Sequence, residues 1–134
     1  MTHQFRKHYT VMEARALLPQ IRAWLDRLNE ARERMEKCDK HLSQLVAGGN
    51  DVGGELVNNW VRALADIKQT LLEFQKREIQ IKDIERGLID FPAFIGEREV
   101  FLCWERDEDD IEFWHDLEAG YAGRERLKPR EPDE

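Results

Sequence analysis

The spacing of apolar residues in the first half of the chain restricts the fold more than any other feature. From Val11 to Val46, apolar side chains recur at alternating intervals of three and four residues, with few interruptions. A second run, from Val57 to Phe74, has the same spacing. Such spacing places apolar side chains along one face of a helix. It predicts two consecutive amphipathic helices that pair in antiparallel orientation.

Local signals set the limits of these helices. Thr10 and Glu13 have the spacing of a capping box, in which each side chain accepts a hydrogen bond from the other residue's amide. Residues 48–54 hold four of the eight glycines in the chain and predict a plain connection between the helices. Pro19, about two turns into the first helix, predicts either a kink or a short first turn before the main helix.

The repeat changes from about 3.6 to about 2 residues near Ile79, where β-branched and aromatic residues become frequent. The fold class is therefore α+β, a long antiparallel helical hairpin followed by a small antiparallel β-meander of three to four strands. We expect a single domain, residues 1–134. Its parts are the hairpin at 10–78, the meander at 79–118 and a loop with a frayed tail at 119–134. The strands are expected at 79–84, 88–95, 98–105 and 111–116.

The turns predict how these strands pair. A two-residue turn beginning at Gly96 suits a type II′ hairpin and fixes the register of the second and third strands. A four-residue loop at 107–110 would pair Leu102 with His115. One face then carries Ile89, Phe91, Ala93, Ile95, Val100, Leu102, Trp104, Ile111, Phe113 and His115. A mixture of aromatic and acidic side chains on the opposite face predicts a second interface or a pocket. That face carries Leu88, Asp90, Pro92, Phe94, Glu99, Phe101, Cys103, Glu105, Glu112, Trp114 and Asp116.

Composition and charge exclude several classes of function. The 134 residues carry a net charge of −7, with the acidic excess in the second half. No nucleic-acid partner is expected, because phosphate binding needs a basic surface. We expect no export signal and no membrane span, and hence a cytoplasmic protein, because no apolar run has the required length. Two cysteines cannot build a disulfide framework.

Cys103 and His115 are the residues to consider first for a metal. They fall on adjacent strands, but the register above puts their side chains on opposite faces, so no cofactor is predicted. A loop one residue shorter would reverse this result and leaves zinc or another divalent cation as the alternative. His115 is otherwise a buried histidine, or a general base oriented by Asp90 or Asp116.

The segment after the last strand has features of a ligand loop. Gly120 and Gly123 permit close turns of the backbone, and Arg124 presents a planar cation to an anion. The favoured interpretation is nevertheless a structural loop that closes the sheet, with Arg124 paired to an acid such as Asp90, and a ligand loop is the alternative. The ligand or metal candidates are Asp90, Cys103, His115, Asp116 and Arg124.

The two helices have more apolar surface than they can cover between themselves. A helix of about 35 residues is about 53 Å long, which exceeds the diameter of a compact chain of this size. We therefore expect a homo-oligomer, most simply a dimer of hairpins. The candidates for its interface are Leu18, Leu25, Trp60, Leu64, Ile67 and Leu71.

Short motifs along most of the chain carry a family resemblance. They are Lys7-His8-Tyr9-Thr10-Val11, Leu17-Leu18-Pro19, Arg86-Gly87-Leu88-Ile89-Asp90-Phe91-Pro92, Val100-Phe101-Leu102-Cys103-Trp104, Trp114-His115-Asp116 and Gly123-Arg124. With these motifs the chain resembles the uncharacterised prokaryotic family DUF2203, a domain of unknown function. Residues 106–110 depart from the family pattern, which has a shorter, glycine-containing turn there. The resemblance implies no activity, but it directs attention to Asp90, Cys103, Trp104, His115, Asp116 and Arg124.

Two functions are compatible with these patterns. The favoured one is a soluble oligomeric binding or scaffolding module that acts through the hairpin and the second sheet face, because no catalytic constellation is evident. The alternative is a small-molecule- or metal-binding protein with its site at the sheet end, and hydrolase or transferase chemistry is an option there. The sequence favours a protein without enzymatic activity.

Overall fold

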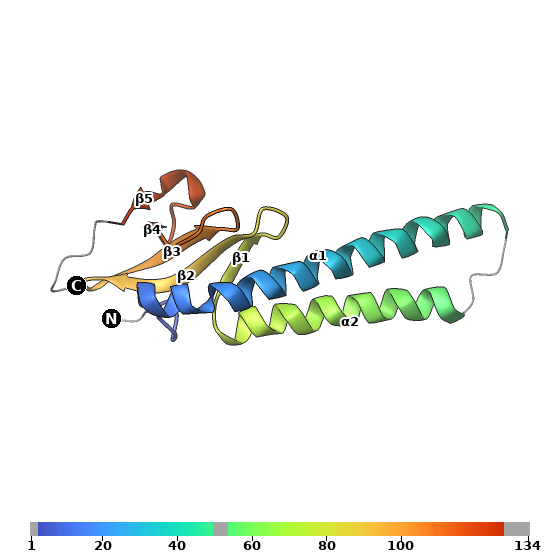
Figure 1. The fold of residues 1–134 in the computed structure, drawn as a ribbon, viewed down its shortest axis with the longest axis horizontal. Coiled ribbons are helices and arrows are strands. Elements are labelled where there is room, and N and C mark those ends of the chain that lie inside the picture. Colours follow the sequence, from blue (N-terminus) through green and yellow to red (C-terminus); the bar gives the residue numbers. More distant parts are fainter. Residues whose placement is uncertain (1–2, 50–53, 128–134) are drawn as a thin grey trace. The chain divides into compact units, whose positions relative to one another are not determined.

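The computed structural model describes residues 3–49 and 54–127, and it has two helices followed by a five-stranded sheet (Figure 1). The helices are α1 (Val11–Ala47) and α2 (Gly54–Lys76). The strands are β1 (Gln80–Asp83), β2 (Leu88–Ile95), β3 (Arg98–Glu105), β4 (Phe113–Asp116) and β5 (Glu125–Arg126), with a short 3-10 helix, η1 (Tyr121–Gly123), before β5. The predicted α+β class, a helical hairpin followed by an antiparallel meander, is confirmed.

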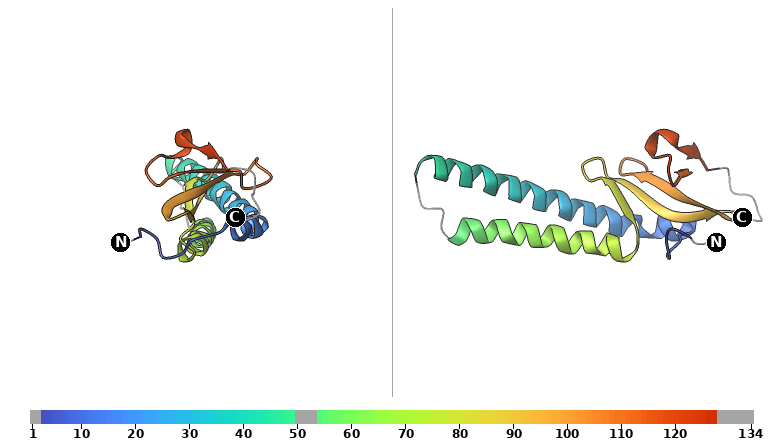
Figure 2. Two further views of the ribbon diagram at one scale, coloured as in Figure 1. Left: turned by 90° about the vertical axis from the view of Figure 1, so that its left-hand side faces the viewer. Right: turned by 180° about the vertical axis from the view of Figure 1, so that it is seen from behind.

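The chain forms two compact units. The helical unit holds residues 20–73, and the sheet unit holds the described residues before and after them, with all five strands. Within the helical unit, α1 and α2 run side by side in opposite directions, as the right-hand view of Figure 2 shows. Among the described residues, no helix has an apolar stretch long enough to cross a bilayer.

The helical unit is built on the predicted apolar spacing. Its buried side chains on α1 are Ile21, Trp24, Leu25, Leu28, Ala31 and Cys38. On α2, Ala63 and Thr70 are fully buried, and the Thr70 hydroxyl donates to the Asp66 carbonyl oxygen at 2.8 Å. Small side chains at these places allow two helices to approach closely. An ion pair of 2.6 Å between Arg34 and Asp66 joins the helices at the surface.

The predicted helix limits hold where the structure describes them. The Thr10 amide donates to Glu13 Oε1 at 2.9 Å, and the Glu13 amide donates to Thr10 Oγ1 at 3.1 Å, so the capping box is confirmed. These hydrogen bonds from Thr10 lower the pKa of Glu13. Helix α1 continues through Pro19 as one element. Of the predicted glycine connection, residues 50–53 lie outside the described residues.

Antiparallel pairing runs through the whole sheet in the order β1-β2-β3-β4-β5. Strands β2 and β3 pair from Leu88 with Glu105 to Ile95 with Arg98, which is the predicted register. Gly96 has a φ of 61°, as the first residue of a type II′ turn requires. Strand β5 was expected to be part of the loop and tail, and it instead pairs with β4. The rest of the predicted tail, residues 128–134, lies outside the described residues.

The predicted register between β3 and β4 is wrong by one residue. Phe101, and not Leu102, pairs with His115. Because side chains alternate between the faces of a strand, this shift moves the whole of β4 to the opposite face. His115 therefore shares a face with Cys103 and Asp90.

The cause of the shift lies in the turn after β3. The Glu105 amide donates to the Glu108 carboxylate at 2.8 Å, and the Glu108 amide donates back to the Glu105 carbonyl at 2.8 Å. The Trp104 indole N–H also donates to the Glu108 carbonyl, at 2.9 Å. These bonds end β3 at Glu105, so residues 106–112 make a longer connection than the four-residue loop expected from sequence.

Within the sheet unit, two glutamates hold the segment before α1 in place. The amides of Gln4 and Phe5 donate to the Glu99 carboxylate at 2.8 and 3.0 Å, and His8 Nε2 lies 2.7 Å from Glu99 Oε2. Glu78 accepts the next two backbone amides at 3.0 and 2.9 Å. The Phe5 ring lies edge-on to Phe101, with ring centroids 5.3 Å apart.

Candidate metal centre

Three neighbouring strands each contribute one potential metal ligand to a single cluster. Asp90 on β2 pairs with Cys103 on β3. His115 on β4 pairs with Phe101, which lies two residues before Cys103 on the same face of β3. One carboxylate oxygen, the thiol sulfur and one imidazole nitrogen all lie within 4.8 Å of one another. All three residues are buried, with exposed fractions of 1% or less. The sequence predicted these residues as separate candidates, and the structure brings them together.

The ring of His115 is fixed by hydrogen bonds at both nitrogens. Nδ1 lies 2.7 Å from the backbone carbonyl oxygen of Asp116, which can only accept, so Nδ1 carries a proton. Nε2 points to Asp90 Oδ2 at 3.0 Å. Burial alone would lower the pKa of His115, but the hydrogen bonds to Asp90 and Asp116 outweigh burial and raise it. A histidine whose Nδ1–H is held by a carbonyl presents Nε2 in the way that metal-ligating histidines do.

Asp90 is not fully satisfied by the protein. Its Oδ2 is near His115, but Oδ1 is buried and has no hydrogen-bond partner. A buried carboxyl oxygen without a partner costs free energy, so such atoms are rare in native proteins. A bound cation would give Asp90 the second partner that it lacks.

Cys103 is a buried free thiol without the chemistry of an activated nucleophile. Its burial, and secondarily the nearby carboxyl of Asp90, raise the pKa of the thiol to about 12. The thiol is therefore protonated at neutral pH and reacts poorly, because the thiolate is the nucleophilic form. A cation in the cluster would reverse this state, because a coordinating thiol is deprotonated.

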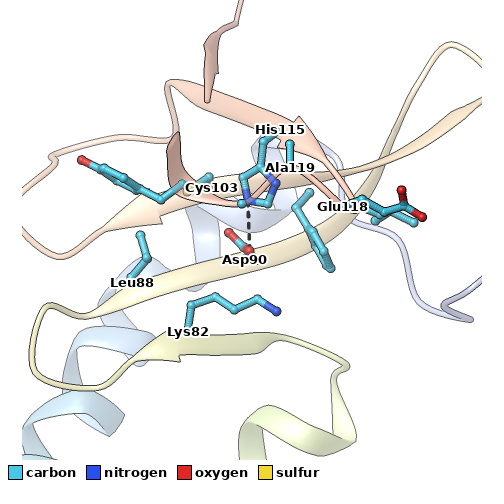
Figure 3. Close-up of a pocket in the computed structure, with 11 residues that line it drawn as sticks. Lys82, Leu88, Asp90, Cys103, His115, Glu118 and Ala119 are labelled. Carbon is cyan, nitrogen blue, oxygen red and sulfur yellow. Dashed lines mark hydrogen bonds and ion pairs between the residues drawn. The ribbon is translucent and has the colours of Figure 1, made fainter. Parts of the chain in front are cut away.

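A pocket of about 290 Å³ opens beside the cluster. Asp90, Cys103 and His115 all line it, so a ligand in the pocket has direct access to the three donors (Figure 3). The figure shows His115 above Asp90 along their contact and the Lys82 side chain on the other side of Asp90. Residues 117–121 supply much of the remaining wall. The pocket expected on the mixed aromatic and acidic face therefore exists.

Two of the predicted site residues do not join the cluster. The Asp116 carboxylate is paired with Arg98, and only its backbone carbonyl supports His115. Arg124 pairs with an acid, as predicted for a structural loop, but the acid is Glu108 and not Asp90: the Arg124 Nη2 donates to both oxygens of Glu108 at 2.8 and 2.6 Å. Its guanidinium also stacks on Phe113 at 3.8 Å from the ring centroid. Arg124 therefore anchors the segment between β4 and β5.

Sequence reasoning gave no site role to Lys82 and did not identify the neighbour of Gly123. Lys82 lines the pocket from β1, and the sequence singled it out only within the family motif Lys82-Asp83-Ile84. Gly123 allows η1 to form close to the pocket, because a Cβ at this position would lie 2.7 Å from the Ala119 Cβ. The Gly123-Arg124 motif indicated a close turn of the backbone, but the sequence did not show that Gly123 lies against Ala119.

The donor set restricts the kind of cation that fits. A thiolate excludes the hard cations Mg²⁺ and Ca²⁺, whereas Zn²⁺ accepts carboxylate, thiolate and imidazole together. Donors around tetrahedral zinc lie about 3.3–3.8 Å apart, so the cluster needs adjustments of only about 1 Å. Three protein ligands leave a fourth position, and here the pocket lies beside it.

The fold and the site define a class, an α+β protein with a helical hairpin, an antiparallel meander and a buried Asp-Cys-His cluster. The family model described as an uncharacterized conserved protein, DUF2203, matches residues 7–127. The chain belongs to this family, which confirms the resemblance found in the sequence motifs. No significant match was found among curated proteins or among solved structures.

Proposed function

We propose that this protein binds a divalent cation of the zinc class through Asp90, Cys103 and His115. The observation that supports the proposal most directly is that three different buried donors lie within 4.8 Å of one another. One of them, Asp90, has a carboxyl oxygen without a hydrogen-bond partner. A lone buried cysteine or an acidic patch would not support it. The combination of thiol, imidazole and carboxyl on three adjacent strands does.

The contacts around the three donors support the same function. The Asp116 carbonyl fixes the ring of His115 through Nδ1, so a cation would replace the contact between Nε2 and Asp90 Oδ2. The backbone pairing of β2, β3 and β4 holds all three ligands on one face. Sites built on strands position their ligands more accurately than sites on loops. When bound, the cation acts as a Lewis acid toward whatever occupies the fourth position.

Cobalt is the appropriate probe, because it occupies zinc sites and reports thiolate ligation by a charge-transfer band. The chain carries a matched control, since Cys38 is also a buried free cysteine but lies on α1. We expect one equivalent of Co²⁺ per chain and a thiolate band in the wild type and in Cys38→Ser. Cys103→Ser should lose the band and bind at least about 100-fold more weakly, a greater loss than removal of an outer-shell partner causes.

Circular dichroism of each variant checks that the fold is retained. Should Cys103→Ser fail to fold, Asp90→Asn removes a ligand charge at nearly constant shape and should weaken Co²⁺ binding at least about tenfold. Wild-type protein that takes up no Co²⁺, or a Cys103→Ser protein that keeps the thiolate band, would contradict the proposal.

We propose self-association of the helices as a second function, with another copy of this chain as the partner. Val57, Val61 and Leu72 on α2 have exposed fractions of 41%, 51% and 49% and lie on one side of the helix. Of the residues predicted for the interface, Leu18 and Leu25 are buried within the chain itself, whereas Trp60, Leu64, Ile67 and Leu71 are half-buried. Of the two helices, α2 carries three exposed apolar side chains on one side, and we assign the partner to that side.

Sedimentation velocity over a range of concentrations tests this association. Val61→Lys places a charge in the exposed apolar stripe and should shift the protein toward the monomer. Asn59→Lys adds the same charge on another side of α2 and should leave the distribution unchanged. A wild type that is monomeric at every concentration would rule the association out.

A further inference from the structure

We infer that the pocket beside the cluster takes a small monoanionic organic ligand, a carboxylate with a short apolar body, whose charged end lies between the cation and Lys82. This inference rests on the proposed metal site, because the cation provides half of the anion's binding. It adds the class of the ligand, which the three metal ligands alone do not define. The charge, the walls and the size of the pocket each contribute to the assignment.

The net charge of the metal-bound cluster favours an anion in the pocket only if another positively charged group is present. A divalent cation bound by one carboxylate and one thiolate is neutral overall, and imidazole adds no charge. An anion in the fourth position gives the centre one negative charge beside three buried ligands, although the outer wall of the pocket is exposed. Such a charge is costly unless a positive group lies nearby.

Lys82 is that positive group. It lines the pocket, and its ammonium lies 5.4 Å from the centroid of the Phe101 ring. No ion pair with a carboxylate is recorded for it within the described part of the chain, unlike Arg86 and Arg98, which are both paired. Figure 3 shows its side chain extending beneath Asp90, on the side of the carboxyl away from His115. Because Lys82 lines the same pocket as the three donors, an anion in that pocket is shared between the cation and the Lys82 ammonium.

The walls of the pocket select the rest of the ligand. Leu88, Phe101 and Leu117 supply apolar surface, so a short hydrocarbon body gains contact by leaving water. Glu118 lies at the same pocket and is exposed. Its carboxylate opposes a second negative charge on the ligand, which disfavours dicarboxylates and phosphate. The volume of about 290 Å³ is at the lower end of the range for small-molecule sites, so the ligand is compact.

Butyrate and its neutral isostere butyramide are the probes that test this inference on the cobalt-loaded full-length protein. We expect butyrate to change the visible cobalt spectrum in a saturable way and butyramide to have no such effect at equal concentration. Lys82→Met removes the charge at similar length and should weaken butyrate about tenfold, as loss of a hydrogen bond to a charged group does. Lys82→Arg should restore most of the affinity.

The outcomes separate this inference from the proposed metal site. Failure to bind Co²⁺ would overturn both. A normal cobalt spectrum that butyrate does not change would overturn only the ligand assignment, as would equal binding of butyramide. Tighter binding of succinate or inorganic phosphate would contradict the monoanion. Unchanged butyrate affinity in Lys82→Met, with the cobalt spectrum intact, would contradict the role of Lys82.

Discussion

The helical unit and the sheet unit bury different kinds of polar group. In the helical unit, the buried polar groups of the described residues are neutral: the Thr70 hydroxyl donates to the carbonyl one turn earlier in its own helix, and the Trp60 indole N–H is buried without a partner. In the sheet unit, Asp90 and His115 are buried together beside a thiol, and one carboxyl oxygen has no partner. Packing accounts for the first unit, whereas the second contains groups whose burial packing does not explain.

Two carboxyls within the sheet unit make the same distinction on a smaller scale. Glu99 accepts hydrogen bonds from two backbone amides and contacts His8, so its charge is fully used in holding the segment before α1. Asp90 is more deeply buried but retains an unpartnered oxygen. A carboxyl whose oxygens both have hydrogen-bond partners stabilises the fold. A buried carboxyl with an unpartnered oxygen is available for a ligand. This difference is the reason for placing the binding site at Asp90.

The largest expected effect tests whether the two units differ as described. Leu28 is fully buried in the helical unit, so Leu28→Ala should lower the free energy of unfolding by about 2–5 kcal/mol through lost contacts and a cavity. Urea unfolding followed by circular dichroism measures this loss. Cobalt binding by the folded variant should keep its stoichiometry and affinity. Loss of cobalt binding in a folded Leu28→Ala protein would break the distinction between a packed unit and a binding unit.

A smaller effect is expected at Glu99. Partial burial alone would raise the pKa of Glu99, but the bonds from Gln4, His8 and Phe5 outweigh burial and lower it. A carboxyl with a lowered pKa in the folded state stabilises the protein above its ordinary pKa. That contribution is lost as pH falls through the folded value. Glu99→Gln should therefore cost about 1 kcal/mol at neutral pH, since the amide keeps one acceptor.

The difference in unfolding free energy between wild type and Glu99→Gln should shrink as the pH falls below about 4, because the wild-type carboxyl then becomes neutral as well. Hydrogen exchange at the amides of residues 4–8 should be faster in the variant, while cobalt affinity stays constant. A difference that grows in acid would contradict the lowered pKa. Lost cobalt affinity would show that Glu99 belongs to the site and not only to the contacts that hold the segment before α1.

Local patterns were sufficient to predict much of this fold. Three-four spacing and the Thr10–Glu13 capping box predicted the helices, and Gly96 alone determined the register of β2 with β3. Each of these features depends on residues that are close in sequence. The pairing of β4 was not predictable in this way, because its register depends on the bonds that Glu108 makes to the end of β3.

For the candidate site, the sequence predicted which residues are involved but not how they are arranged. Asp90, Cys103 and His115 were identified, yet the assumed four-residue loop placed His115 on the wrong face. Glu99 was noticed only as part of a mixed face, since its partners are 91 to 95 residues away in sequence. Strand β5 has two residues, which is too short for any periodicity. Contacts that depend on distant or very short segments leave no local pattern to read.

The one-residue shift of β4 has a consequence for folding itself. Asp90 and Cys103 are brought together by the hairpin turn at Gly96, but the third donor arrives only if β4 joins in the observed alignment. In the slipped alignment His115 would face away, and only two donors would remain. An ion that needs all three donors would bind the observed alignment and not the slipped one, so metal binding would stabilise the observed register of β4.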